Sequence, residues 1–180
     1  MLPSWNKNEK RRTTFFPGEG KVLVDVDDEV YECENSLPIA AVLFSNLEYT
    51  LDDDKVLTIN GRIDITDDYE APIGLNFSTQ HLERGEWRTG VFSSLIKDFC
   101  PDILNPMKPW YFVTKTLNQT KCPYKKGHVE IMDDFKYGTY GVPIPFNMLG
   151  EWKLFWEIST KRNGQMVKEC NMQRVFLTDG

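Results

Sequence analysis

The chain has 180 residues, of which 41% are hydrophobic and 13% aromatic, and its formal net charge is −6. This length suits one domain with a sizeable core, and the aromatic content excludes a disordered chain. The acidic balance argues against nucleic-acid binding, which needs a basic face, and no apolar run approaches the roughly 20 residues that cross a bilayer.

The first 20 residues are expected to form a flexible N-terminal tail, and residues 21–180 a single domain. The tail carries basic residues between Lys7 and Arg12, which an import signal or a solvated tail would both explain. It shows no apolar segment of the kind that a signal peptide needs. This start fits either a mature or truncated form of a secreted protein, or a protein that stays inside the cell.

Alternation of apolar and polar residues predicts strands along most of the domain, as in a sheet with one dry and one wet face. The clearest alternation is in residues 55–66 and 150–160, where the apolar residues of one face are Leu57, Ile59, Ile63, Ile65, Trp152, Leu154, Trp156 and Ile158. Weaker signals predict strands over residues 21–26, 29–34, 40–51, 73–82, 110–117, 128–135 and 172–178. The pair Asn163-Gly164 lies between two strands and predicts the final hairpin.

Residues 89–101 carry the one helix signal. Their apolar residues fall at i, i+3, i+4 and i+7, as Phe92, Leu95, Ile96 and Phe99. Thr89 would cap this helix, and Cys100-Pro101 would end it. The proline-bearing stretches around residues 100–109 and 140–149 are expected to be irregular.

Four cysteines lie far apart in the sequence, at Cys33, Cys100, Cys122 and Cys170. None forms a Cys-x-x-Cys pair, and only His81 and His128 could add imidazole ligands, so we expect no metal and no cofactor. An even count suits two disulfides, with three possible pairings. We favour Cys33–Cys170, which would tie the first strand to the last, and Cys100–Cys122, which would close a shorter loop. Four reduced thiols are the alternative.

Asn76 and Asn118 each begin an Asn-x-Ser/Thr sequon and are the candidate glycosylation sites. About one such match is expected by chance in a chain of this composition, so the pair is weak evidence for secretion.

No catalytic signature is found: the sequence holds no Gly-x-Ser-x-Gly, P-loop, dinucleotide fingerprint or His-Glu-x-x-His. The acidic clusters in residues 25–29 and 52–54 do not match an EF-hand loop and are interpreted as solvated turns. We expect no enzyme activity and no catalytic residue.

Large apolar side chains are abundant, and they either fill an ordinary sandwich core or line a hollow one that accepts a ligand. Periodicity cannot separate these two interpretations. The candidate cavity residues are Leu57, Ile59, Ile63, Ile65, Phe92, Phe99, Trp110, Phe112, Trp152, Leu154 and Trp156, and the stretch Pro143–Phe146 is a candidate for the mouth.

The order of these features resembles a known family. A cysteine in an early strand is followed by the expected short helix that ends in Cys-Pro, then by "CPYKKGHVEI", by "YGVPIPFNMLGEWKLFWEI" and by a last cysteine before the closing strand. Over roughly residues 22–177 this resembles the ganglioside-activator-like lipid-recognition family, and most of all its insect chemosensory, CheB-type branch. The classical activator has more cysteines than this chain.

The resemblance implies an all-β fold, a β-cup or β-sandwich of antiparallel strands with one short helix and two disulfides, paired as favoured above. It also implies a secreted, extracellular, non-enzymatic glycoprotein that binds a lipid or long-chain hydrocarbon in an apolar cavity. Its role would be chemosensory, such as pheromone perception, with a receptor or a membrane surface as a further partner and no nucleic acid. One alternative is a lipid-presenting activator for a hydrolase; another is an intracellular protein-interaction sandwich with a filled core.

Overall fold

The computed structural model describes residues 12–15, 22–27, 29–51, 56–108, 110–139 and 148–179. Most of this part is strand, together with a 3₁₀ turn, η1 (Cys100–Asp102), and a short helix, α1 (Tyr111–Thr114). The strands are β1 (Arg12–Phe15), β2 (Val22–Val26), β3 (Val42–Leu51), β4 (Val56–Ile65), β5 (Glu70–Glu83), β6 (Glu86–Ile96), β7 (Val129–Thr139), β8 (Gly150–Arg162) and β9 (Gln165–Asp179). None of the helices in this part of the chain has the length and apolar character that a membrane span needs.

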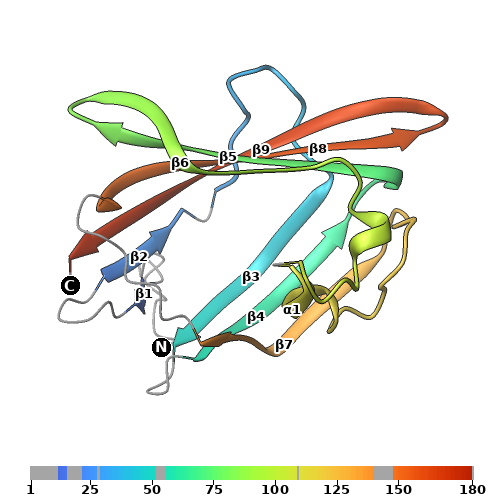
Figure 1. Ribbon diagram of the computed structural model, residues 1–180, viewed down its shortest axis with the longest axis horizontal. Helices are drawn as coiled ribbons and strands as arrows, with labels where there is room; N and C mark the ends of the chain where they lie inside the picture. The colour runs from blue at the N-terminus through green and yellow to red at the C-terminus, as the bar shows by residue number, and fades with distance from the viewer. Residues whose placement is uncertain are drawn as a thin grey trace, which may run out of the picture.

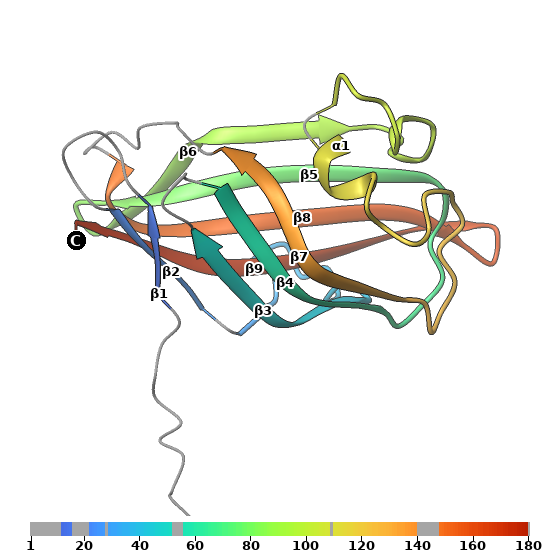
Figure 2. The ribbon, with the colours of Figure 1, turned by 90° about the horizontal axis from the view of Figure 1, so that it is seen from below.

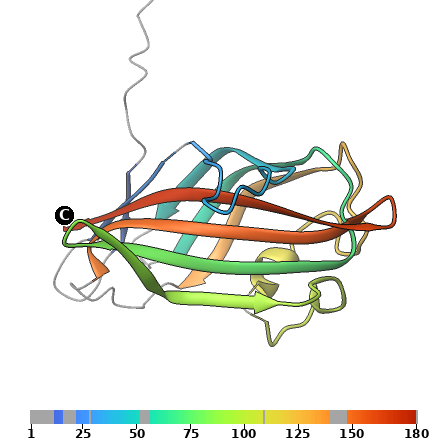
Figure 3. The same ribbon diagram turned by 90° about the horizontal axis from the view of Figure 1, so that it is seen from above.

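The strands form two antiparallel sheets (Figure 1). The larger sheet has the order β1-β2-β9-β8-β5-β6, and the smaller sheet has the order β3-β4-β7. Figure 3 shows β5, β8 and β9 as long strands side by side in the larger sheet. Seen from the opposite side, in Figure 2, the smaller sheet lies across the larger one. The prediction of an all-β sandwich of antiparallel strands is confirmed.

Seven of the nine predicted strands are present in the structure. The segments expected from residues 21–26, 40–51, 55–66, 73–82, 128–135, 150–160 and 172–178 correspond to β2, β3, β4, β5, β7, β8 and β9. The β8–β9 hairpin turns at Asn163 and Gly164, whose φ angles of 51° and 78° are both positive. Two positive φ angles are what a tight two-residue hairpin turn requires, and Asn followed by Gly adopts them at low cost.

The helix predicted over residues 89–101 is wrong, because Glu86–Ile96 is strand β6. This strand forms one edge of its sheet, where apolar residues are not all buried: Phe92 is 48% exposed and Leu95 is 70% exposed. The helical spacing of these apolar residues therefore did not indicate a buried helix face.

The strand predicted over residues 110–117 is also wrong, because Tyr111–Thr114 forms helix α1. Trp110, Tyr111 and Val113 favour strands, but tertiary contacts override that preference. The Trp110 indole N–H donates to the Asp102 carbonyl at 3.0 Å, and the Thr114 hydroxyl donates to the Ile103 carbonyl. These bonds fold the segment back onto η1 and the turn after it.

Two smaller corrections concern the N-terminal third. The expected strand over residues 29–34 is reduced to one bridge, between Tyr31 and Met172. The segment expected to be a tail contains strand β1, which pairs with β2; the rest of residues 1–20 lies outside the described residues.

Two clusters of buried residues hold the fold together. The first lies between the sheets, and its buried members are Ile65, Tyr69, Ile73, Ile103 and Tyr124. The second lies on the other face of the larger sheet, where segment 29–40 crosses it, and contains Cys33, Cys170 and Met172. We call the face of each sheet that borders the first cluster its inner face, and the opposite face its outer face.

Both favoured disulfides are present, so the pairing prediction is confirmed. Cys33 bonds to Cys170 and Cys100 bonds to Cys122, each with a Cα–Cα distance of 5.8 Å. Two disulfides are compatible with an extracellular protein, because oxidising compartments preserve them.

Candidate functional site

The inner face of the larger sheet is built by opposed residues of β5 and β8. Directly opposed residues of an antiparallel pair point to the same face, and alternate pairs share it. The inner-face rows, from one end to the other, are Leu75 with Ile158, Phe77 with Trp156, Thr79 with Leu154, and His81 with Trp152. Trp152, Leu154 and Trp156 therefore share one face, as the sequence predicted.

The first of these rows is packed against the smaller sheet. Leu75 and Ile158 contact the central cluster, to which the smaller sheet contributes Val42, Ile63 and Ile65. In that sheet Val42 is opposed to Ile65, so these two side chains form its innermost row. At this end, which we call the closed end, the two inner faces pack against each other.

One row further along, the packing is incomplete. Trp156 is 46% exposed, although it lies on a central strand and its ring contacts Phe77 at a centroid distance of 4.3 Å. In the smaller sheet, the inner-face row next to Val42 and Ile65 pairs Phe44 with Ile63, and Phe44 is 51% exposed. Large aromatic residues on inner faces are normally covered in a filled sandwich. The two inner faces thus leave aromatic surface open beyond the first row.

The last row is covered again. Trp152 is buried, its ring stacks on His81 at 4.2 Å, and its indole N–H donates to the Met148 carbonyl at 2.8 Å. His81 Nε2 lies 3.1 Å from the Leu149 carbonyl oxygen, and the Phe92 ring lies 6.1 Å from that of Trp152. Trp152 is therefore a packed residue with satisfied polar contacts, whereas Trp156 is open.

The remaining predicted cavity residues separate into two groups. Phe99 packs against the central cluster and against Trp110, at a ring distance of 5.7 Å, so both belong to the closed end. The side chains of Leu57, Ile59 and Phe112, and the whole stretch Pro143–Phe146, lie outside the described residues.

Two inner-face aromatic residues, Phe44 and Phe77, were missed as candidates. The signal was available, because alternation places Phe44 with Val42 and places Phe77 with Leu75.

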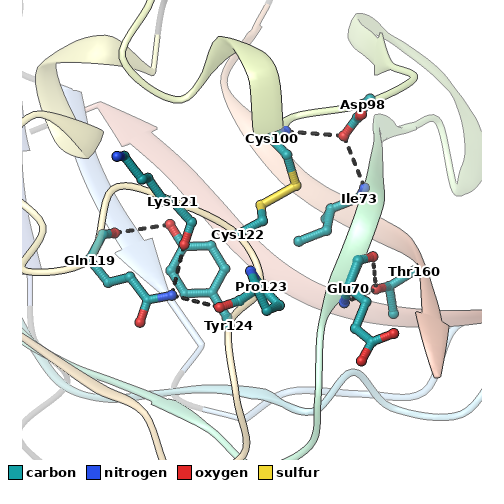
Figure 4. The surroundings of a disulfide bond; sticks show 10 residues. All are labelled: Glu70, Ile73, Asp98, Cys100, Gln119, Lys121, Cys122, Pro123, Tyr124 and Thr160. Atoms are coloured by element: carbon teal, nitrogen blue, oxygen red, sulfur yellow. Dashed lines mark hydrogen bonds between the residues drawn. A yellow bond between two sulfur atoms is a disulfide. The ribbon is translucent and has the colours of Figure 1, made fainter. Parts of the chain in front are cut away.

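The Cys100–Cys122 disulfide organises the closed end (Figure 4). An Asp98 carboxylate oxygen accepts hydrogen bonds from the backbone N–H groups of Ile73 and Cys100, both at 3.1 Å. The Gln119 side-chain amide donates to the carbonyls of Lys121 and Pro123, both at 2.7 Å. The Asp98 contacts fix the Cys100 segment against β5, and the Gln119 contacts hold the Cys122 loop in its turn.

Both sequon asparagines are exposed, but their surroundings differ. Asn76 lies within β5 on its outer face, opposed to Leu95 of β6. Asn118 follows α1, and the buried Glu130 carboxylate accepts from the backbone N–H groups of Asn118 and Gln119 at 2.8 and 2.9 Å. The Asn118 turn is thus anchored by its backbone while its side chain faces solvent.

A buried polar cluster near the closed end escaped the sequence analysis. Glu169 is 4% exposed; it accepts from the Tyr69 hydroxyl at 2.5 Å, from Arg162 at 2.5 Å and from the Ala41 N–H at 3.2 Å. Burial and the Glu169 carboxylate raise the pKa of Tyr69 well above its ordinary value, so its hydroxyl stays a donor. A buried carboxylate with three donors joins β9 to the end of β8 and to the residues that directly precede β5 and β3.

Replacing Tyr69 by Phe should lower the free energy of unfolding by about 2 kcal/mol, because a buried carboxylate loses one of its donors. Tyr124→Phe is the matched control: its hydroxyl donates to a neutral carbonyl, that of Gln119, at 3.1 Å. The control should cost about 1 kcal/mol. Urea unfolding followed by circular dichroism measures both. Equal losses of unfolding free energy in the two variants would show that the hydrogen bond to Glu169 stabilises the fold no more than a hydrogen bond to a neutral carbonyl.

Within the described ranges, no three His, Cys, Asp or Glu side chains gather as metal ligands. No protein-family model matches the chain, and no curated protein resembles it significantly in sequence.

Proposed function

We propose that the protein is a secreted, non-enzymatic binder of a hydrophobic ligand, a lipid or long-chain hydrocarbon, held between the inner faces of its two sheets. The observation that carries this proposal is the half-exposed Trp156, in the middle of the larger sheet, together with the half-exposed Phe44 on the smaller one. Open aromatic surface on two facing sheets favours an apolar occupant, because covering it removes apolar area from water.

The energetics favour long chains. Burying one methylene contributes about 0.8 kcal/mol, so a twelve-carbon chain gains roughly 10 kcal/mol before costs. Association costs on the order of 4 kcal/mol or more, which leaves an affinity of about micromolar strength or weaker. Contacts of this kind select for chain length and apolar character, with little selectivity for a headgroup.

The proposed secretion is supported by the two disulfides and by the exposure of both sequon asparagines. A role in chemosensory perception rests on the family resemblance described above, since uptake of a pheromone or cuticular lipid suits a carrier with an apolar site.

The test begins with protein expressed through a secretory pathway. Bound lipid is extracted from one sample with organic solvent, and a second, folded sample is titrated with a fluorescent fatty acyl probe. We expect copurified lipid in the extract and saturable probe binding that unlabelled long-chain hydrocarbon displaces. An empty extract together with no probe binding would contradict the proposal.

A lipid-presenting activator is the second candidate, and one observation favours it. The loop between η1 and α1 exposes Leu104 and Met107, the latter to 88%, and could contact a membrane surface. Transfer of lipid from vesicles separates the two functions. An activator extracts lipid from the vesicle and increases hydrolase activity, whereas a carrier binds dispersed ligand and needs no enzyme.

A further inference from the structure

Strand β6 is an edge strand whose C-terminal part, from Gly90 to Ile96, has no charged residue and no proline. It ends the larger sheet beside β5 (Figure 2), and the opposite edge strand, β1, is only four residues long. Proteins usually protect a long edge with charged residues or proline, which discourage pairing with another chain. From Gly90 to Ile96, β6 contains neither.

The outer face of this strand is apolar and exposed. Leu95 is opposed to Asn76, and Ser93 to Ser78, which places alternate residues of β6 on the outer face. The register shift between Ser78 and Gln80 inserts two extra residues in β6, so the alternation continues through Val91. Val91 is 78% exposed and Leu95 is 70% exposed.

We propose that β6 pairs antiparallel with the β6 strand of a second copy, about a twofold axis at Ser93, and so forms a homodimer with one continuous sheet. This register aligns Val91 of each subunit with Leu95 of the partner subunit, so the twofold symmetry gives two such apolar pairs. Every residue paired from Gly90 to Ile96 is uncharged. The unpaired backbone groups of both edges gain partners at the same time.

The charges at the ends of the strand select this register over its neighbours. With the axis at Ser93, Arg88 comes close to Asp98 of the partner subunit, which lies two residues beyond the end of β6, so opposite charges approach each other. With the axis at Phe92, Glu86 would align with Asp98 of the partner subunit, which is repulsive. With the axis at Ser94, Lys97 of the partner subunit would lie opposite Val91, so its charge would face an apolar side chain and have no partner. Like charges directly opposed across strands are destabilising.

A contact of seven residues per strand is smaller than a standard stable interface, so the dimer should be weak and concentration-dependent. It also leaves the ligand site separate, because β8, which carries Trp156, is two strands away from this edge.

Sedimentation velocity over a concentration series tests the dimer on the disulfide-intact, full-length chain. N-glycans are removed enzymatically first, because Asn76 lies beside Leu95. The average mass should rise from the 20.9 kDa monomer towards twice that value. Val91→Lys and Leu95→Lys should each abolish the rise, whereas Met107→Lys, which charges an exposed apolar residue outside β6, should preserve it. A monomer at every concentration, or a dimer that survives both β6 variants, would overturn the proposal.

Cross-linking tests the register. A Ser93→Cys variant places two cysteines across the proposed axis, within the Cα separation that a disulfide spans. It should form a covalent dimer under mild oxidation, whereas Thr89→Cys should not. A cross-link at Thr89 but not at Ser93 would refute this register. If the wild-type chain stays monomeric but binds phosphatidylcholine vesicles in a Val91-dependent manner, the edge is a lipid-binding surface and the dimer proposal is wrong.

Discussion

Removal of the Cys33–Cys170 disulfide, by Cys33→Ala with Cys170→Ala, should lower the free energy of unfolding by about 4–5 kcal/mol. This bond joins residues 137 positions apart, and a cross-link that closes a long loop restricts the unfolded chain strongly. It also attaches segment 29–40 to the outer face of the larger sheet, where both sulfur atoms are buried with Met172. Guanidinium unfolding, followed by tryptophan fluorescence, measures the loss.

The second disulfide is the matched comparison. Cys100 and Cys122 are only 22 positions apart, so removing their bond should cost about 3 kcal/mol. The expected order is therefore a larger loss for the Cys33–Cys170 variant than for the Cys100–Cys122 variant. The reverse order would mean that local packing at the closed end, and not loop closure, determines how these bonds stabilise the fold.

A Phe44→Glu substitution should weaken binding of a fluorescent acyl probe by at least about tenfold, which corresponds to 1.4 kcal/mol. The new carboxylate would face the proposed ligand space, and covering it with an acyl chain would remove water from a charge without providing a partner. The folded state should tolerate the change, because Phe44 is already half exposed. Probe titration measures affinity, and thermal unfolding verifies that the variant is folded.

Ile131→Glu provides the control, since Ile131 is 56% exposed. It is opposed to Arg62, which is opposed to Ser45, the residue after Phe44, so Ile131 lies on the outer face of the smaller sheet, away from the proposed ligand. Probe affinity should remain that of the wild type. Equal weakening by both variants would point to a general charge effect and would remove the support for an inner-face site.

Periodicity predicted those strands that have one buried and one wet face. Residues 55–66 and 150–160 alternate because their inner residues meet a core, and they became β4 and β8. At the edge strand β6 this reasoning fails, since Val91 and Leu95 are apolar but exposed. Local pattern cannot show that a strand lies at an edge, because its position depends on the other strands of the sheet.

The candidate site was predictable in part. Alternation placed Trp152, Leu154 and Trp156 on one face, and the structure agrees. It could not show that Trp152 is covered while Trp156 is open, because this depends on His81, Phe92 and the smaller sheet, which are distant in sequence. The buried Glu169 cluster was missed for the same reason: its donors come from three separate segments.

The most direct test of an open, ligand-accepting inner face is contact quenching of Trp156. A long-chain fatty acid brominated along its chain quenches an indole only on contact, and a Trp156→Phe variant identifies the part of the signal that this residue contributes. We predict saturable quenching of the wild-type protein, most of which disappears in the variant, while an unbrominated chain of the same length leaves the emission intensity unquenched. Quenching that is absent, or that is the same in both proteins, would contradict a ligand held against Trp156.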